Sequence, residues 1–319
     1  MARFRASRER RRAPELPVAT GNQLMYSAAI RDWYEKRLKL FINSMAADYE
    51  AEIKRWLKDG GALGQPTSDA MGADARRIFK RSWWTKFVAK QFERLSKAWA
   101  NKAEDFGRDT ASQFALKVDK HSFTSVNSSL KALGIEAPKN IGEQEFSERI
   151  AQYVEYNVSL LKRNTDEFKA KVQTAVWQSL TAPEPDQQGG QGIFNAIKDE
   201  KERLASNAEL IAQDQTAKMT SVLNNARMES NGIDEFEWVH SSAGKTPRPC
   251  HVAWNGRIFS TQGGPNELYE VLEDGTLLKY EAGKDGAREG DIGKPGFAIR
   301  CRCRAKPVFR ALANTNDNT

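Results

Sequence analysis

Apolar residues recur at steps of three and four over a long run near the start of the chain. The run lies within residues 22–58 and consists of Ile30, Tyr34, Leu38, Phe41, Met45, Tyr49, Ile53 and Trp56. Because an α-helix has 3.6 residues per turn, these steps place every member on one face. A long helix with one apolar face must bury that face against other helices. This run therefore predicts a bundle of helices rather than a sheet at this end of the chain.

Two further stretches show the same periodicity. One begins near Ser68 and Asp69, which suit a helix N-cap, and is expected to extend to about residue 114. Its apolar stripe is Trp84, Val88, Phe92, Leu95 and Trp99. The other begins near residue 142, with the stripe Phe146, Ile150, Val154, Leu161, Phe168, Val172, Val176 and Leu180. Between residues 120 and 140 the periodicity breaks. Three long amphipathic helices predict an elongated antiparallel bundle.

The fold class we expect is a mainly α N-terminal region of long amphipathic helices plus a small α+β C-terminal domain. Pro and Gly dominate residues 182–192, which predicts a flexible linker. The expected parts are a basic disordered tail over 1–20, an α-helical region over 21–181, the linker, a helix with the small α+β domain over 193–310, and a disordered tail over 311–319. In the small domain, Asp274-Gly275 lies between two apolar runs and predicts a β-hairpin.

Composition excludes several classes of protein. The chain has 319 residues, of which 29% are charged and 39% hydrophobic, and it contains no apolar run of membrane-span length. The basic start leads into no apolar core, so a secretory signal is not expected and the cytosol is the expected compartment. Three cysteines, an odd number, favour a reduced or metal-bound state over a disulfide framework.

The net charge of +7 is concentrated in two clusters of cations. Residues 1–12 hold six arginines, and residues 294–310 hold six cations and no acid. Such clusters suit a polyanion, because cations near phosphates release condensed counterions. The alternative for the N-terminal cluster is a solubilising tail. The candidate contacts to double-stranded DNA, without sequence preference, are Arg3, Arg5, Arg8, Arg10, Arg11, Arg12, Lys245, Arg248, Arg300, Arg302 and Arg304.

Four residues of the small domain are candidate metal ligands. Cys250, His251, Cys301 and Cys303 are types that zinc accepts in a tetrahedral site, and a small loop-rich domain gains stability from such an ion. The tight Cys-x-Cys spacing favours a second interpretation, in which the cysteines are buried small residues and His251 is hydrogen-bonded in its loop. A disulfide between Cys250 and either other cysteine is a third. A structural zinc therefore remains one of three alternatives.

No catalytic constellation is evident, and we expect a protein that is not an enzyme. Gly244-Lys245-Thr246 lacks the earlier glycine of a phosphate-binding loop and is followed by prolines instead of a helix. Cys250 and His251 are adjacent, so in an extended segment they point to opposite faces and cannot act as nucleophile and base.

The last third of the chain resembles the head morphogenesis family of tailed bacteriophages, the minor capsid proteins related to protein F of phage Mu. The likeness lies in a helix bearing Ile211 to Gln215, an aromatic strand after residue 233, an Arg-Pro-x-His motif with a following Asn-Gly, and Pro-Gly before Cys-x-Cys. The motif positions are Ile211, Asp214, Gln215, Arg248, Pro249, His251, Gly256, Pro295, Gly296, Cys301 and Cys303. Many members carry an acidic residue before the Arg-Pro-x-His, where this chain has residues 243–245 without one.

The resemblance implies a minor capsid protein in the virion that acts in head assembly, genome packaging or delivery. Its implied partners are the portal protein, the major capsid or scaffold protein, and double-stranded DNA. Asp214 and Gln215 are either solvated or bonded to the loop of residues 241–251, which would fix the small domain on its helix. The alternatives are a non-specific DNA-binding protein without a capsid role and a relative linked to a toxin or transferase.

Overall fold

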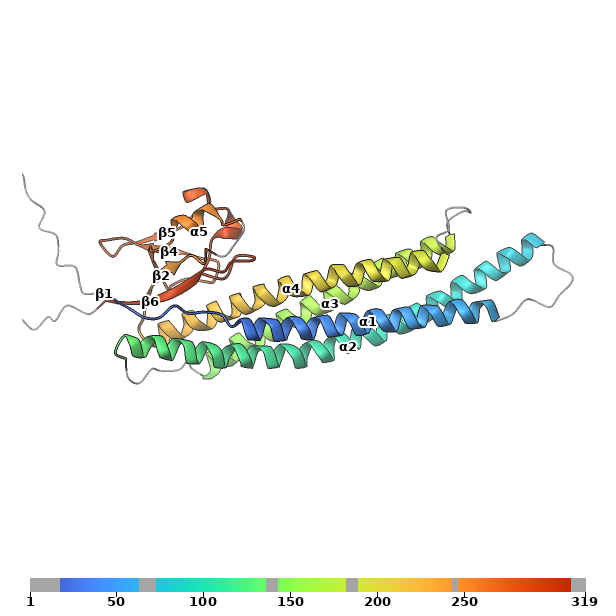
Figure 1. The fold of residues 1–319 in the computed structure, drawn as a ribbon, viewed down its shortest axis with the longest axis horizontal. Helices are drawn as coiled ribbons and strands as arrows, with labels where there is room; N and C mark the ends of the chain where they lie inside the picture. Colours follow the sequence, from blue (N-terminus) through green and yellow to red (C-terminus); the bar gives the residue numbers. More distant parts are fainter. Residues whose placement is uncertain (1–17, 63–72, 136–142, 182–188, 243–245, 311–319) are drawn as a thin grey trace, which may run out of the picture. The chain divides into compact units, whose positions relative to one another are not determined.

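Four long helices and one antiparallel sheet make up the fold (Figure 1). The computed structural model describes residues 18–62, 73–135, 143–181, 189–242 and 246–310. The helices are α1 (Ala28–Ala62), α2 (Ala73–Ala132), α3 (Glu143–Thr181) and α4 (Gly189–Ser230). The short elements that follow include α5 (Pro249–Ala253) and the 3₁₀ turns η1 (Lys284–Gly286) and η2 (Glu289–Asp291). The expected fold class, long helices followed by a small α+β region, is confirmed.

The sheet has six strands in the order β1-β6-β2-β3-β4-β5, and every neighbouring pair is antiparallel. The strands are β1 (Val18–Thr20), β2 (Glu235–Val239), β3 (Ile258–Ser260), β4 (Tyr269–Val271), β5 (Leu277–Lys279) and β6 (Arg304–Arg310). Strands β4 and β5 form the hairpin predicted from Asp274-Gly275. Gly275 takes a φ of 82° there, and the Asp274 carboxylate accepts the Thr276 N–H at 2.9 Å.

The chain folds into two compact units. The helical unit contains Tyr26–His121 and Ile141–Thr220. The sheet unit contains Met1–Met25, Ser122–Asn140 and Ser221–Thr319. Within the described residues, none of the helices contains an apolar run long enough to cross a bilayer.

The apolar stripe of α1 packs inside the helical unit as its period predicts. Seven of its eight members, Tyr34 to Trp56, are at most 5% exposed. Tyr49 of α1 makes edge-on ring contacts with Phe92 of α2 at 5.6 Å and with Phe168 of α3 at 5.2 Å between centroids. Aromatic contacts of this geometry add to the free energy gained from burial alone. The helices therefore pack through the stripes that the sequence shows. The side chains of three stripe members, Trp84, Phe146 and Leu180, are not among those that the structure describes.

Helix α2 continues to Ala132, beyond the point where the apolar pattern breaks. Its last turns bury Ser122, Val126, Ser129 and Leu130, each 0% exposed, at helical spacing in the sheet unit. The Ser122 hydroxyl donates to the Asn224 side chain at 2.7 Å, and Arg227 donates to the same hydroxyl at 2.7 Å. Tertiary hydrogen bonds thus keep polar residues of modest helix propensity in the helix. The expected break at residue 120 was wrong.

The structure also differs from the expected organisation at two segment ends. Val18–Thr20, expected in the N-terminal tail, form β1 because they pair with β6, and the Gly21 N–H donates to the Pro307 carbonyl at 2.9 Å. Residues 189–192, expected in the linker, are the first turn of α4. Residues 1–17, 182–188 and 311–319 lie outside the described residues.

Lys294 is a buried cation in the sheet unit, 3% exposed. Its Nζ donates to the carbonyls of Ser260 and Gln262 at 2.7 Å each. Burial lowers the pKa of this lysine to about 8 from an ordinary value of 10.5. A neutral amine retains two N–H groups, which suffice for both carbonyls.

This lysine predicts a specific pH dependence of stability. Between about pH 8 and pH 10.5 the unfolded chain binds more protons at Lys294 than the folded chain, so the free energy of unfolding rises with pH, by roughly 3 kcal/mol in total. Urea unfolding across this range measures the effect. Lys294→Met is the control, since it removes this contribution and leaves other alkaline titrations in place. Equal pH slopes in the two proteins would refute the prediction.

Candidate metal centre

His251, Cys301 and Cys303 converge in the sheet unit. Each offers one ligand atom, and these atoms all lie within 4.8 Å of one another. Nδ1 of His251 lies 3.6 Å from the Sγ atom of Cys301 and 3.6 Å from that of Cys303. All three residues are buried, at 3 to 5% exposure. One imidazole nitrogen and two thiol sulfurs form a donor set that can hold a metal ion.

Two segments far apart in the sequence position these ligands. His251 lies in α5, which starts at Pro249, where a proline costs no hydrogen bond. The cysteines lie just before β6, after a turn in which the Cys301 N–H donates to the Ala298 carbonyl at 2.8 Å. Pairing of β6 with β2 fixes that segment, and β2 carries Trp238, whose ring meets His251 edge-on at 5.1 Å. The ligands are therefore brought together by sheet pairing.

The hydrogen bond on the far side of the His251 ring fixes its tautomer. Nε2 lies 2.9 Å from the backbone carbonyl oxygen of Asp291 in η2. Because a carbonyl oxygen only accepts, Nε2 carries the proton and donates it. In the neutral ring the lone pair then lies on Nδ1, which is the nitrogen nearest both sulfurs. Metal-bound histidines are held in the same way by an acceptor on the second nitrogen.

The two thiols have different acidities. The pKa of Cys301 lies well below its usual value, because Cys303 donates a hydrogen bond to its sulfur and His251 lies beside it, which outweighs burial. The Cys303 backbone N–H also donates to this sulfur at 3.4 Å. The pKa of Cys303 is raised, because its proton is shared with Cys301 and because it is buried. The cluster thus favours one thiolate, which is the form that binds metals.

Two buried indoles enclose the cluster. Trp254 stacks on the His251 ring with 5.1 Å between centroids, and both Trp238 and Trp254 are 0% exposed. The Trp238 Nε1–H has no hydrogen-bond acceptor among the described residues.

Cys250, the fourth ligand considered from the sequence, is not a member of this group. It lies in α5, where neighbouring side chains diverge by about 100° around the helix axis. Its side chain is 0% exposed in the apolar core, and burial raises the pKa of its thiol. All three cysteines are free thiols, so neither disulfide considered from the sequence is present. Of the four candidate ligands, three lie close enough together to bind one ion, and Cys250 packs in the apolar core.

The residues that orient the site could not be found from the sequence. Asp291 acts through its main-chain carbonyl, and Trp238 reads as an ordinary core residue of an aromatic strand. The Asn-Gly motif behaves as a turn: Gly256, at a φ of 81°, donates its N–H to the Trp238 carbonyl at 2.8 Å, and the Asn255 side chain accepts the His240 N–H at 2.8 Å. Pro295 and Gly296 form a turn closed by the Phe297 N–H and the Lys294 carbonyl at 3.0 Å.

The C-terminal cations are largely engaged within the sheet unit. Lys306 pairs with Glu237 at 3.1 Å and Arg310 with Glu235 at 2.8 Å, while Lys294 is buried. Arg248 pairs with Asp291, and Arg304 donates to the Gln23 side chain at 3.4 Å. Arg300 is exposed and Arg302 half-buried. The six N-terminal arginines and Lys245 lie outside the described residues. The described part of the C-terminal cluster is therefore not a row of unpaired cations.

Asp214 and Gln215 are buried in the helical unit, at 8% and 3% exposure. Gln215 accepts a hydrogen bond at 3.4 Å from Asn157 of α3, whose side chain also accepts the Tyr34 hydroxyl of α1 at 2.8 Å. Of the two alternatives considered from the sequence, the solvated pair does not fit this burial, and a bond to the loop of residues 241–251 stays a prediction. Gln215 instead joins a polar network between helices, and Ile211 on the same helix is half-buried.

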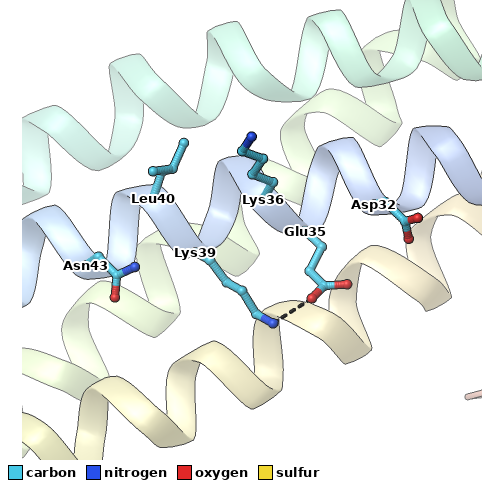
Figure 2. Close-up of a pocket in the computed structure, with 6 residues that line it drawn as sticks. All are labelled: Asp32, Glu35, Lys36, Lys39, Leu40 and Asn43. Carbon is cyan, nitrogen blue, oxygen red and sulfur yellow. Dashed lines mark hydrogen bonds and ion pairs between the residues drawn. The ribbon is translucent and has the colours of Figure 1, made fainter.

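The helical unit carries no comparable cluster among its described residues. A surface hollow along α1 is lined by Asp32, Glu35, Lys36, Lys39, Leu40 and Asn43 (Figure 2). Lys39 and Glu35 form an ion pair at 2.5 Å, and Leu40 is 54% exposed. Solvated charges one turn apart on a helix are a common surface feature, so the hollow is not a candidate site.

Comparison with other proteins finds a distant relative. The chain is 25% identical over 280 residues to a protein of Haemophilus influenzae described as uncharacterized, and the alignment covers 87% of this chain and 53% of that protein. The chain thus spans about half the length of the relative it matches. No family model matches the chain, and no solved structure matches it.

Proposed function

We propose that this chain is a minor capsid protein of a tailed bacteriophage, built into the head beside the portal or inner shell and acting in head assembly, genome packaging or delivery. The observation that carries the proposal is that four of the family-like residues lie together in the sheet unit. Arg248, His251, Cys301 and Cys303 surround a single buried cluster, and Gly256 forms a turn beside it. The proposal rests on the resemblance of these residues to the head morphogenesis family, and their common position in the sheet unit is compatible with a shared role.

The two units suit different parts of this function. The helical unit offers long surfaces on which partner helices of a portal, shell or scaffold protein can dock. The sheet unit carries Arg300 and Arg302. Strand β1, which follows the arginine-rich residues 1–12 in the sequence, pairs with β6 of this unit. Contacts to packaged DNA would therefore come from the sheet unit. This role needs no catalytic residue, and we propose that the protein is not an enzyme.

Co-purification tests the proposal. When the protein is expressed with its cognate portal, scaffold and major capsid proteins, we expect it to sediment with procapsids and to remain in mature particles. Deletion of its gene should reduce infectious yield. If it is absent from both particles, and its deletion leaves the yield unchanged, the capsid role is wrong. Salt-sensitive binding to duplex DNA under those circumstances would favour a DNA-binding protein without a capsid role.

We also propose that His251, Cys301 and Cys303 hold a zinc ion that stabilises the sheet unit, with its fourth coordination position filled from outside this group. Bonds of about 2.3 Å to sulfur and about 2.0–2.1 Å to nitrogen place the nitrogen and each sulfur of a tetrahedral zinc site roughly 3.5–3.6 Å apart. Both His251 Nδ1 to Sγ distances are 3.6 Å. Two thiol sulfurs with one imidazole favour zinc over the oxygen-seeking magnesium and calcium ions. The bound ion would link α5 to the start of β6.

A further inference from the structure

Arg248 contacts both segments that build the cluster. Its Nε forms an ion pair and hydrogen bond with the carboxylate of Asp291, and its Nη2 donates to the Ile299 carbonyl at 2.7 Å. The side chains of Arg248 and Asp291 are 30% and 15% exposed. Ile299 lies two residues before Cys301, and Asp291 is the residue whose carbonyl holds His251. One guanidinium therefore joins the loop that orients the histidine to the segment that carries the thiols.

Asp291 has two separate functions in this arrangement. Its backbone carbonyl accepts the proton of His251 Nε2, while its carboxylate accepts from Arg248 and, at 3.2 Å, from the Arg288 N–H that opens η2. The carboxylate thus holds the 3₁₀ turn in the conformation that presents the carbonyl to the histidine. Arg248 also lies at the N-cap position of α5, three residues before His251. The helix carrying the histidine and the turn holding it are consequently tied by the same ion pair.

We propose that Arg248 and Asp291 are positioning residues of the metal site, and that they set its affinity without touching the ion. This inference rests on the proposed zinc site. A protein without the ion pair still has His251, Cys301 and Cys303. However, the two segments that carry them must become ordered before the three ligands can bind one metal ion. Groups that orient metal ligands commonly change affinity by about 10- to 100-fold. Lysine cannot replace the arginine, because a single ammonium lacks the planar fork that reaches both acceptors.

Zinc affinity, measured by competition with a chromophoric chelator, tests the proposal on the full-length protein. We expect Arg248→Met and Asp291→Asn to weaken zinc binding by about 10- to 100-fold. The zinc affinity of the Arg248→Lys variant should be little better than that of Arg248→Met. Lys306→Met is the matched control, since it removes a half-buried cation with one carboxylate partner from the same unit and should leave affinity within about twofold. Cobalt(II) substitution should still give thiolate-to-metal absorption in the Asp291 variant at saturation, which shows that the ligands are unchanged.

Each result distinguishes the positioning role from the site itself. If the wild-type protein binds zinc and the Arg248 and Asp291 variants bind it within about twofold of the wild type, the positioning role is overturned and the zinc site stands. If the wild-type protein binds no zinc, the proposed site is wrong and this inference falls with it. Should Arg248→Met fail to fold, Arg248→Lys and Asp291→Asn carry the test, because the first keeps the positive charge and the second keeps the shape of the aspartate side chain.

Discussion

Cys303→Ser is expected to remove zinc from the purified protein and to destabilise the sheet unit. The wild-type protein should contain about one zinc ion per chain, because the donor set forms a single site. The variant keeps His251 and Cys301, and a serine hydroxyl is a poor substitute for a thiolate. At a free zinc concentration about 1,000 times the dissociation constant, the ion adds about 4 kcal/mol to the free energy of unfolding, and the variant should lose that contribution. Elemental analysis and thermal unfolding with and without a chelator measure both effects.

Cys250→Ala is the matched control for this experiment. Cys250 is as buried as the other two cysteines but lies outside the ligand group, so the control should keep its zinc. Its cost should be limited to a small cavity, about 1–2 kcal/mol. Loss of zinc from both variants would indicate a four-ligand site that includes Cys250. A wild-type protein with no stoichiometric metal and three reactive thiols would favour simple packing of the cysteines.

Phe168→Ala is expected to destabilise the helical unit strongly. Phe168 is 0% exposed and packs edge-on against Tyr49 of α1, which in turn packs on Phe92 of α2. Truncation removes the apolar contacts of one ring and leaves a cavity between three helices. Comparable substitutions cost about 3–5 kcal/mol. Urea unfolding followed by circular dichroism at the helix signal should show a lower midpoint.

Tyr156→Ala, on the same helix, provides the comparison. Tyr156 is 48% exposed, and surface substitutions usually change stability by less than about 0.5 kcal/mol. Both variants remove an aromatic ring from α3, so helix propensity changes similarly in the two. Equal effects would mean that α3 does not pack through the Phe168 face, which would contradict the packing of the helical unit.

Local patterns were sufficient to predict the helices and the hairpin. The stripe from Tyr34 to Trp56 has one buried face at the period of an α-helix, and a long run of such steps suits no other regular structure. Asp274-Gly275 predicted the β4–β5 turn because the backbone there needs a φ of 82°, which glycine adopts without strain. These features depend on residues within a few positions of one another, so the sequence displays them directly.

The sequence was ambiguous where polar residues are buried. The sequence around Ser122 and Ser129 suggested the end of a helix, yet both residues lie on the buried face of α2. Asn224 and Arg227 of α4 form hydrogen bonds with the Ser122 hydroxyl. A main-chain carbonyl accepts a hydrogen bond from the Ser129 hydroxyl. From the sequence, Gln215 could be solvated or bonded to the loop of residues 241–251, and in the structure its side chain accepts a hydrogen bond from Asn157. A polar residue can be buried only when a partner is present, and the partner is more than 50 positions away in each case.

The chain by itself determined the type of ligands available near its C-terminus, and the tertiary structure decided which of them meet. From spacing alone, Cys250, His251, Cys301 and Cys303 were equivalent candidates. The short helix α5 turns Cys250 into the core and His251 toward the thiols, while β6, by pairing with β2, brings the cysteines to that histidine. A metal ion binds only where the ligand atoms lie at short distances from one another. A sequence sets these distances only through the fold that it adopts.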